Sequence, residues 1–223
     1  MTTPLIDAIQ IETGPNPTAS VIWMHGLGAD GGDFVPIVRE LNLNGCPSIR
    51  FIFPHAPTMP VTINNGYVMR AWYDLLGMDL VTRQDEAGLR KSQAAIEQLI
   101  AQEKSRGVAA DHIVLAGFSQ GCAMTLQVGL RHPEKLAGML CLSGYVPIAH
   151  TVAEERQAAN QDTPIFMAHG SMDPVVTLDR AEISRDLLTS LGYAVDWHTY
   201  PMQHAVCPQE IYDIGTWFRT ILR

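Results

Sequence analysis

One serine of the chain lies in a setting that makes a hydroxyl group nucleophilic. Ser119 belongs to the segment 117–121, with sequence GFSQG, which follows the apolar run 112–116 and precedes a helix-like stretch, 122–131. A strand, a Gly-x-Ser-x-Gly turn and a helix form a nucleophile elbow, in which the glycines let strand and helix approach closely. The chemistry predicted is attack on an acyl carbonyl. The alternative is a glycine-rich turn whose serine only caps the next helix.

Such a serine needs an imidazole that takes its proton and a carboxylate that orients the imidazole. In α/β-hydrolases the acid and then the histidine follow the serine, each in a loop after a strand. Asp173 comes shortly after the apolar run 165–169, and His204 lies between the last predicted strand and the last predicted helix. We therefore expect Ser119, Asp173 and His204 to form a catalytic triad.

The other histidines have simpler structural explanations. His169 ends a predicted strand but precedes Asp173, which is the wrong chain order for the base. The remaining histidines after the serine are His132, His150 and His198, at a helix end, before a predicted helix and inside a strand. His25 and His55 also end strands, and we expect packing roles because a metal site would need clustered ligands. The sequence predicts neither a metal nor a cofactor.

The segment 26–31, with sequence GLGADG, matches the G-x-G-x-x-G pattern of a dinucleotide-binding turn. A nucleotide-dependent oxidoreductase would also need an acidic residue about 20 positions later to bind the ribose, and residues 51–55 hold none. The loop suits an oxyanion hole better, with the backbone N–H groups of Leu27 and Gln120 as donors. Because only the backbone of Gln120 is used, we expect its side chain to be replaceable.

The composition limits the partners. A formal net charge of -8 without a basic run argues against nucleic acid and anionic membrane surfaces. The first residues do not show the basic segment and apolar run of an export signal, and no stretch has membrane-spanning length, so we expect an unexported protein without stable membrane insertion. Four widely spaced cysteines without C-x-x-C indicate free thiols and a cytoplasmic location. The length suits one domain, residues 1–223.

Apolar runs alternate with amphipathic stretches, which is typical of an α/β fold. The predicted strands cover 20–25, 49–54, 112–117, 136–142, 164–169 and 193–200, and the predicted helices 33–43, 84–106, 120–131, 178–191, 208–222 and one after residue 151. We expect a three-layer sandwich around a mostly parallel sheet, without a large cap domain. The segment 57–74 interrupts the alternation and is expected to cross the carboxyl edge of the sheet as a long loop without regular structure.

Several segments together resemble the acyl-protein thioesterase and carboxylesterase family, also called the phospholipase/carboxylesterase family, of small serine hydrolases. The matching segments are 25–28 (HGLG), 70–74 (RAWYD), 117–121 (GFSQG), 142–145 (LSGY), 169–170 (HG) with 173–174 (DP), and His204. The resemblance implies a capless α/β-hydrolase with the triad and donors named above, and with Trp72 lining the pocket. Cys122 and Gln203 depart from the family pattern, since glycine is usual at both positions.

The chain is thus predicted to be a serine hydrolase that cleaves carboxylic esters or thioesters with short to medium acyl chains through an acyl-enzyme. An exposed apolar groove with contacts from Trp72, Leu27 and Val175 would bind a small-molecule ester or acyl-thioester. Core packing is the alternative for Trp72. An acylated protein is a further candidate substrate, and acyl-protein thioesterase or lysophospholipase activity and a homodimer remain open. A non-catalytic binding protein of this fold is disfavoured, because no triad member is missing.

Overall fold

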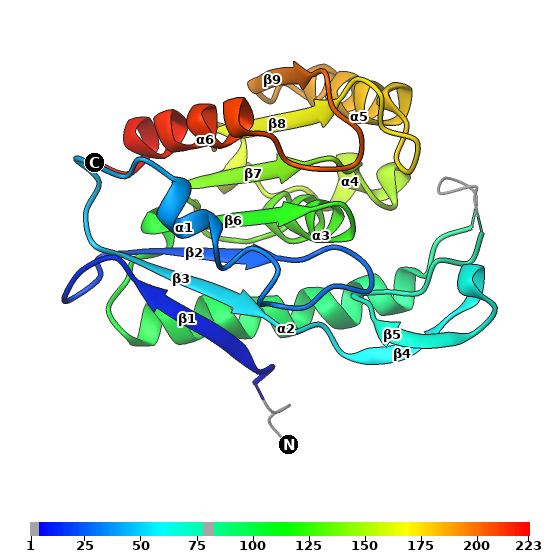
Figure 1. Ribbon diagram of the computed structural model, residues 1–223, viewed down its shortest axis with the longest axis horizontal. Helices are drawn as coiled ribbons and strands as arrows, with labels where there is room; N and C mark the ends of the chain where they lie inside the picture. Colours follow the sequence, from blue (N-terminus) through cyan, green and yellow to red (C-terminus); the bar gives the residue numbers. More distant parts are fainter. Residues whose placement is uncertain (1–4, 78–82) are drawn as a thin grey trace.

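A central sheet organises the computed structural model, which describes residues 5–77 and 83–223 (Figure 1). Its strands, in spatial order, are β1 (Ala8–Glu12), β3 (Ile49–Pro54), β2 (Ala19–Met24), β6 (Ile113–Phe118), β7 (Gly138–Leu142), β8 (Ile165–Gly170) and β9 (Val195–Tyr200). All neighbours run parallel except β1, which pairs antiparallel with β3. The inner strands are buried on both faces, which explains their continuous apolar sequences.

Helices cover both faces of this sheet and complete three layers (Figure 1). They are α1 (Ile37–Glu40), α2 (Glu86–Ser105), α3 (Gln120–Gly129), α4 (Ala149–Glu155), α5 (Leu178–Ser190) and α6 (Pro208–Ile221). The apolar sides of α1 and α6 share one core with one face of the sheet, and α2, α3 and α5 pack in two further clusters on the other face. The predicted three-layer α/β architecture is confirmed, and the described residues contain no large cap. None of their helices has the length and apolarity needed to cross a membrane.

Two local expectations were wrong, and one strand was not predicted. The segment 57–74 is not irregular, because β4 (Thr58–Val61) and β5 (Tyr67–Arg70) pair in a hairpin that turns through Asn65 and Gly66, both at positive φ. The helix expected over 33–43 is reduced to the four residues of α1, which follow Pro36. Strand β1 was not expected, because it is a half-exposed edge strand without a continuous apolar run.

The parallel strands bring distant segments to one edge of the sheet. The loop after β2, the start of α3 after β6, the loop after β8 and the loop after β9 all lie at carboxyl ends of neighbouring strands. The β4–β5 hairpin joins them there, since the Gly28 N–H donates to Arg70 O over 2.9 Å. Open α/β sheets bind their ligands at this edge.

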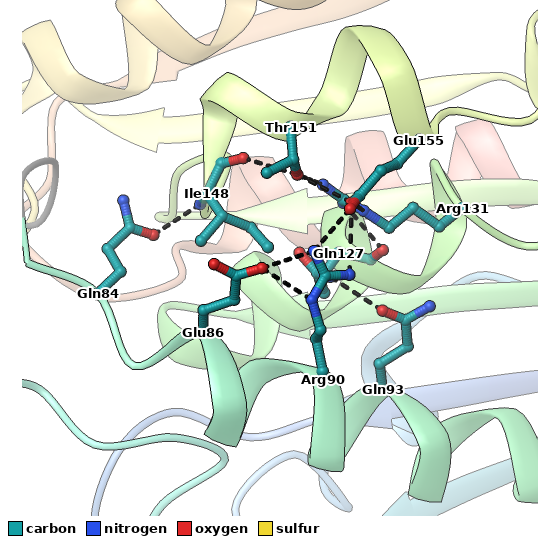
Figure 2. A network of polar contacts seen from close by, with 9 residues as sticks. All are labelled: Gln84, Glu86, Arg90, Gln93, Gln127, Arg131, Ile148, Thr151 and Glu155. Atoms are coloured by element: carbon teal, nitrogen blue, oxygen red, sulfur yellow. Dashed lines mark hydrogen bonds and ion pairs between the residues drawn. The ribbon is translucent and has the colours of Figure 1, made fainter.

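A polar network fastens α4 to the helices beneath it (Figure 2). Glu155 of α4 accepts hydrogen bonds at 2.6 Å from Arg90 of α2 and from Arg131, which follows α3. Burial opposes ionisation, but hydrogen bonds from Arg90, Arg131 and Thr151 outweigh it and lower the pKa of Glu155 to about 2. Because the Arg131 side chain is only 4% exposed, loss of Glu155 would leave a buried charge without this partner.

The same network holds a strained residue at the start of α4. Ile148 has φ 37° and ψ 49°, a left-handed conformation that a β-branched side chain rarely adopts. Its N–H donates to Gln84 Oε1 over 2.6 Å (Figure 2). The network and this bond together fix the segment 143–148, which leads into α4.

Candidate active site

The turn between β6 and α3 holds Ser119 in a strained backbone conformation. Its φ of 55° and ψ of -116° form a backbone conformation that is unfavourable for residues other than glycine and that occurs at nucleophile elbows. A Cβ atom on Gly121 would lie 2.1 Å from Met24 O, and one on Gly117 would lie 2.2 Å from the Gly121 carbonyl carbon. Glycine is therefore required at both positions, as the elbow pattern predicts.

The structure brings the three predicted catalytic side chains together. His204 Nε2 lies 2.9 Å from Ser119 Oγ, and His204 Nδ1 lies 2.6 Å from Asp173 Oδ2. Because the carboxylate can only accept, Nδ1 carries the proton and Nε2 is left to accept the serine proton. The Phe118 ring packs against the imidazole with 4.8 Å between ring centroids. The predicted base thus lies within hydrogen-bonding distance of both the predicted nucleophile and the predicted orienting acid.

Asp173 is buried and well supplied with donors. Its Oδ1 accepts the N–H groups of Val175 and Val176 at 2.8 and 3.0 Å, which leaves Oδ2 for the imidazole. His169 lies 3.4 Å from the same Oδ2, but its Nε2 donates to Val176 O over 2.7 Å. Burial lowers the pKa of His169, so this ring is neutral and braces the acid loop.

The two residues whose backbone amides are predicted to form the oxyanion hole both lie beside Ser119. Gln120 is the first residue of α3, so its N–H has no acceptor within the helix. Leu27 and Gln120 line the same cavity as Ser119. The neighbouring Gly28 N–H already donates to Arg70 O, which leaves the Leu27 amide as the better candidate in that loop.

The side chain of Gln120 contradicts the expectation that it is replaceable. It is buried, its Oε1 accepts the Trp72 N–H over 2.8 Å, and its Nε2 donates to Tyr73 O over 2.8 Å. The side-chain amide thus satisfies the backbone N–H of Trp72 and the backbone carbonyl of Tyr73. Nothing in the local sequence indicated this, because both partners lie almost 50 residues away, at |i−j| of 48 and 47.

Trp72 also differs from its predicted place in the pocket. Its side chain is 1% exposed and does not line the cavity that contains Ser119. The ring packs on His25 with 5.3 Å between centroids, and its Nε1–H donates to His25 O over 2.9 Å. Trp72 therefore lies behind the wall of the pocket, in the core.

A largely apolar cavity of about 560 Å³ opens beside Ser119. Its apolar side chains are Leu27, Ala29, Ile63, Leu75, Phe118, Pro174, Val175 and Val176, joined by the aromatic rings of Tyr73 and Tyr145. The two tyrosine hydroxyls are 2.8 Å apart, and burial raises the pKa of Tyr145 to about 12, so both stay neutral. Val175 lies in the lining as predicted and is 60% exposed at the cavity mouth.

Sequence reasoning missed most of this lining. Tyr73 and Tyr145 occupy segments that matched the family pattern, and this was the one available signal for them. Ile63 lies in the turn of the unexpected β4–β5 hairpin and Leu75 follows the hairpin, and the Ile63 N–H donates to Leu75 O over 2.9 Å. Their approach to the serine depends on tertiary structure alone.

The two departures from the family pattern are both accommodated. Cys122 is fully buried, and a Cβ on Gly144 would lie 2.5 Å from its sulfur, so the missing side chain at 144 makes room for the thiol. Gln203 exposes its side chain, while its backbone carbonyl would lie 2.3 Å from a Cβ on Gly170. Neither residue displaces His204 from its partners.

The chain is similar to known proteins over nearly its whole length. The family model described as Phospholipase/Carboxylesterase matches residues 7–222. Acyl-protein thioesterase 1 of Yarrowia lipolytica is 40% identical over 219 residues, covering 96% of each chain. Acyl-protein thioesterase 1 of Neurospora crassa is 43% identical over 203 residues, covering 87% of this chain and 83% of that protein.

Solved structures agree with this similarity. SOBER1 of Arabidopsis thaliana superposes with a TM-score of 0.86 at 29% identity, covering 92% of this chain and 99% of that one. Acyl-protein thioesterase 2 of Zea mays gives a TM-score of 0.85 at 26% identity, covering 97% of this chain and 100% of that one. Fold and sequence comparisons thus point to the same group of proteins.

Proposed function

Because the chain belongs to the phospholipase/carboxylesterase family of α/β-hydrolases, it is a serine hydrolase of esters or thioesters, and we propose that Ser119, His204 and Asp173 perform the hydrolysis. The observation that carries this proposal is the pair of contacts that His204 makes, 2.9 Å to Ser119 and 2.6 Å to Asp173. The three side chains come from three loops at one edge of the sheet, and no other described group offers the serine a base at this distance.

Each residue has a role that its surroundings support. His204 takes the proton as Ser119 Oγ attacks the carbonyl, and the Leu27 and Gln120 amides stabilise the oxyanion. His204 then protonates the leaving alcohol or thiol, which departs from the acyl-enzyme. Water repeats the sequence with His204 as base and releases the carboxylic acid.

The cavity favours an apolar acyl group of short to medium length. Its volume of about 560 Å³ falls within the range of small-ligand sites, and its walls are mostly aliphatic and aromatic. An acyl group carried by a protein is the second candidate, favoured by the activity named for the Yarrowia and Neurospora relatives and by the exposed mouth at Val175. A lysophospholipid offers the same acyl chemistry and is the third.

Replacement of the nucleophile tests the triad. Ser119→Ala should abolish hydrolysis of a p-nitrophenyl acetate or butanoate and prevent labelling by a fluorophosphonate. Ser171→Ala, at an exposed position near the site, should keep both and serves as the matched control. Turnover and labelling that survive in the Ser119→Ala protein would remove this serine from its role.

A substrate panel separates the acyl donors. We expect kcat/KM for p-nitrophenyl esters to rise from acetyl to hexanoyl or octanoyl and then to fall. Parallel assays with an S-acylated peptide and with a lysophospholipid measure the two alternatives directly. A peptide thioester cleaved faster than any matched small ester would identify a protein thioesterase.

We also propose that residues 1–223 act as one domain in the cytoplasm. All four cysteines are free thiols in the structure, which suits a reducing compartment. A single cooperative unfolding transition and four alkylatable thiols in protein taken directly from cells are the expected results. The oligomeric state, including the candidate homodimer, is measured by sedimentation.

A further inference from the structure

The segment 70–73, which begins with the last residue of β5, contacts the neighbours of one proposed oxyanion donor, Leu27, and the side chain of the other, Gln120. On one side, Arg70 O accepts the Gly28 N–H over 2.9 Å, and the Trp72 indole N–H donates to His25 O over 2.9 Å. These two hydrogen bonds fix the backbone at His25 and at Gly28, directly before and after the pair Gly26-Leu27. The proposed donor Leu27 is thus held from both flanks by the segment 70–73.

The same segment holds the other donor through a side chain. Gln120 Oε1 accepts the Trp72 backbone N–H, and Gln120 Nε2 donates to Tyr73 O, both over 2.8 Å. A helix start that carries an oxyanion donor is thereby tied to the segment at two points. Trp72 makes contacts on both sides: its indole N–H donates to the loop after β2, and its backbone N–H donates to the Gln120 side chain at the start of α3.

The surroundings of Trp72 make this bridge rigid. Its side chain is 1% exposed, its carbonyl accepts the Ser92 hydroxyl of α2, and its ring packs on His25. His25 is in turn fixed, since its Nε2 accepts the Ala56 N–H over 3.1 Å. Oxyanion stabilisation depends on donors that stay in place before and during reaction, so such a frame has a direct catalytic effect.

We propose that Trp72 is a positioning residue that sets the distance between the Leu27 and Gln120 amides, and that it does not contact the acyl chain. This inference rests on the proposed function. It predicts that loss of the indole N–H weakens binding of the transition state more than binding of the substrate. A residue lining the acyl pocket would instead change the preference among acyl chains.

Trp72→Phe keeps an aromatic ring and removes the donor to His25 O. Trp23→Phe is the matched control, because Trp23 of β2 is also fully buried and its indole nitrogen has no partner among the described residues. Relative to this control, we expect kcat for an acetyl ester to fall about tenfold to a hundredfold, below the full loss of one donor, at nearly constant KM. The octanoyl-to-acetyl ratio of kcat/KM should stay constant.

Two further readouts respond to the oxyanion hole itself. The inhibition constant of a trifluoromethyl ketone should rise by the same factor as kcat/KM falls, because this inhibitor forms the tetrahedral oxyanion. The infrared carbonyl stretch of the trapped acyl-enzyme should move to higher wavenumber as its hydrogen bonds weaken. Gln120→Met keeps the backbone donor, removes both side-chain bonds and should change the same quantities, which covers the case that Trp72→Phe fails to fold.

The outcomes separate the two proposals. Kinetics of Trp72→Phe within twofold of Trp23→Phe, or a changed chain-length ratio with an altered KM, would overturn the positioning role while an inactive Ser119→Ala protein upholds the triad. An active Ser119→Ala protein would overturn the proposed function itself, whatever the tryptophan variants do.

Discussion

Replacing the buried carboxyl group of Glu210 with an amide should stabilise the protein at neutral pH. Glu210 lies in the first turn of α6 with 0% exposure. Burial raises the pKa of its carboxyl group from 4.5 to about 8, against the effect of the Cys207 backbone amide and with a further increase from Asp213. The folded protein therefore keeps a proton that the unfolded chain has lost, throughout the range between these values.

The sign of the effect follows from this difference in bound protons. Between pH 4.5 and about 8 the native state binds more protons than the unfolded state, so the free energy of unfolding falls as pH rises. At about 1.4 kcal/mol per pH unit, the loss reaches roughly 3 kcal/mol at pH 7 and levels off near 5 kcal/mol above pH 8. Glu210→Gln removes this loss, so its free energy of unfolding at neutral pH should exceed that of the wild type by most of this amount.

Urea unfolding of the wild type and Glu210→Gln between pH 4.5 and 8.5 measures the gain. The two free energies should agree at the acidic end and diverge steadily up to about pH 8. Glu154→Gln, at an exposed position of α4, controls for removal of a surface charge and should follow the wild type. A Glu210→Gln protein that is less stable at pH 8, or whose difference does not depend on pH, would refute the reasoning.

Three further predictions concern the elbow, the α4 network and the acyl cavity. Gly121→Ala places a Cβ 2.1 Å from Met24 O, so thermal unfolding should show a loss of about 1–3 kcal/mol and fluorophosphonate labelling should slow. Glu155→Gln leaves Arg131 without its carboxylate; because the pKa of Glu155 is lowered to about 2, the variant should be less stable at neutral pH and approach the wild type as pH falls from 4.5 toward 2. Leu75→Ala removes apolar wall, so kcat/KM for octanoyl esters should drop severalfold more than for acetyl esters.

The sequence located the reactive side chains because their positions follow from topology. In a parallel sheet all carboxyl ends meet at one edge, so loops after β2, β6, β8 and β9 must converge once the strands are recognised. Chain order then selected Asp173 and His204, and in the structure His204 lies within hydrogen-bonding distance of Ser119 and of Asp173. Local sequence patterns and chain order were therefore sufficient to identify the three side chains of the predicted triad.

What the sequence missed depends on contacts between distant segments. Gln120 was the unspecified residue of a motif, and only the fold brings its side chain to Trp72 and Tyr73. Trp72 was expected in the pocket, because a large ring beside a reactive serine suits either a lining or a core position until its partners are known. Strand β1 lacked the apolar run on which the other strands were recognised.

The contact between Cys122 and Gly144 limits which residues position 144 can accept. A Cβ on Gly144 would lie 2.5 Å from the Cys122 sulfur and 2.8 Å from Ser119 O, so it would clash both with a side chain and with the backbone of the elbow. Glycine at 122 would relieve only the first of these clashes, so position 144 should stay glycine whichever residue stands at 122. Cys122→Gly should therefore be tolerated, whereas Gly144→Ala should slow fluorophosphonate labelling of Ser119 in the wild type and in the Cys122→Gly protein alike.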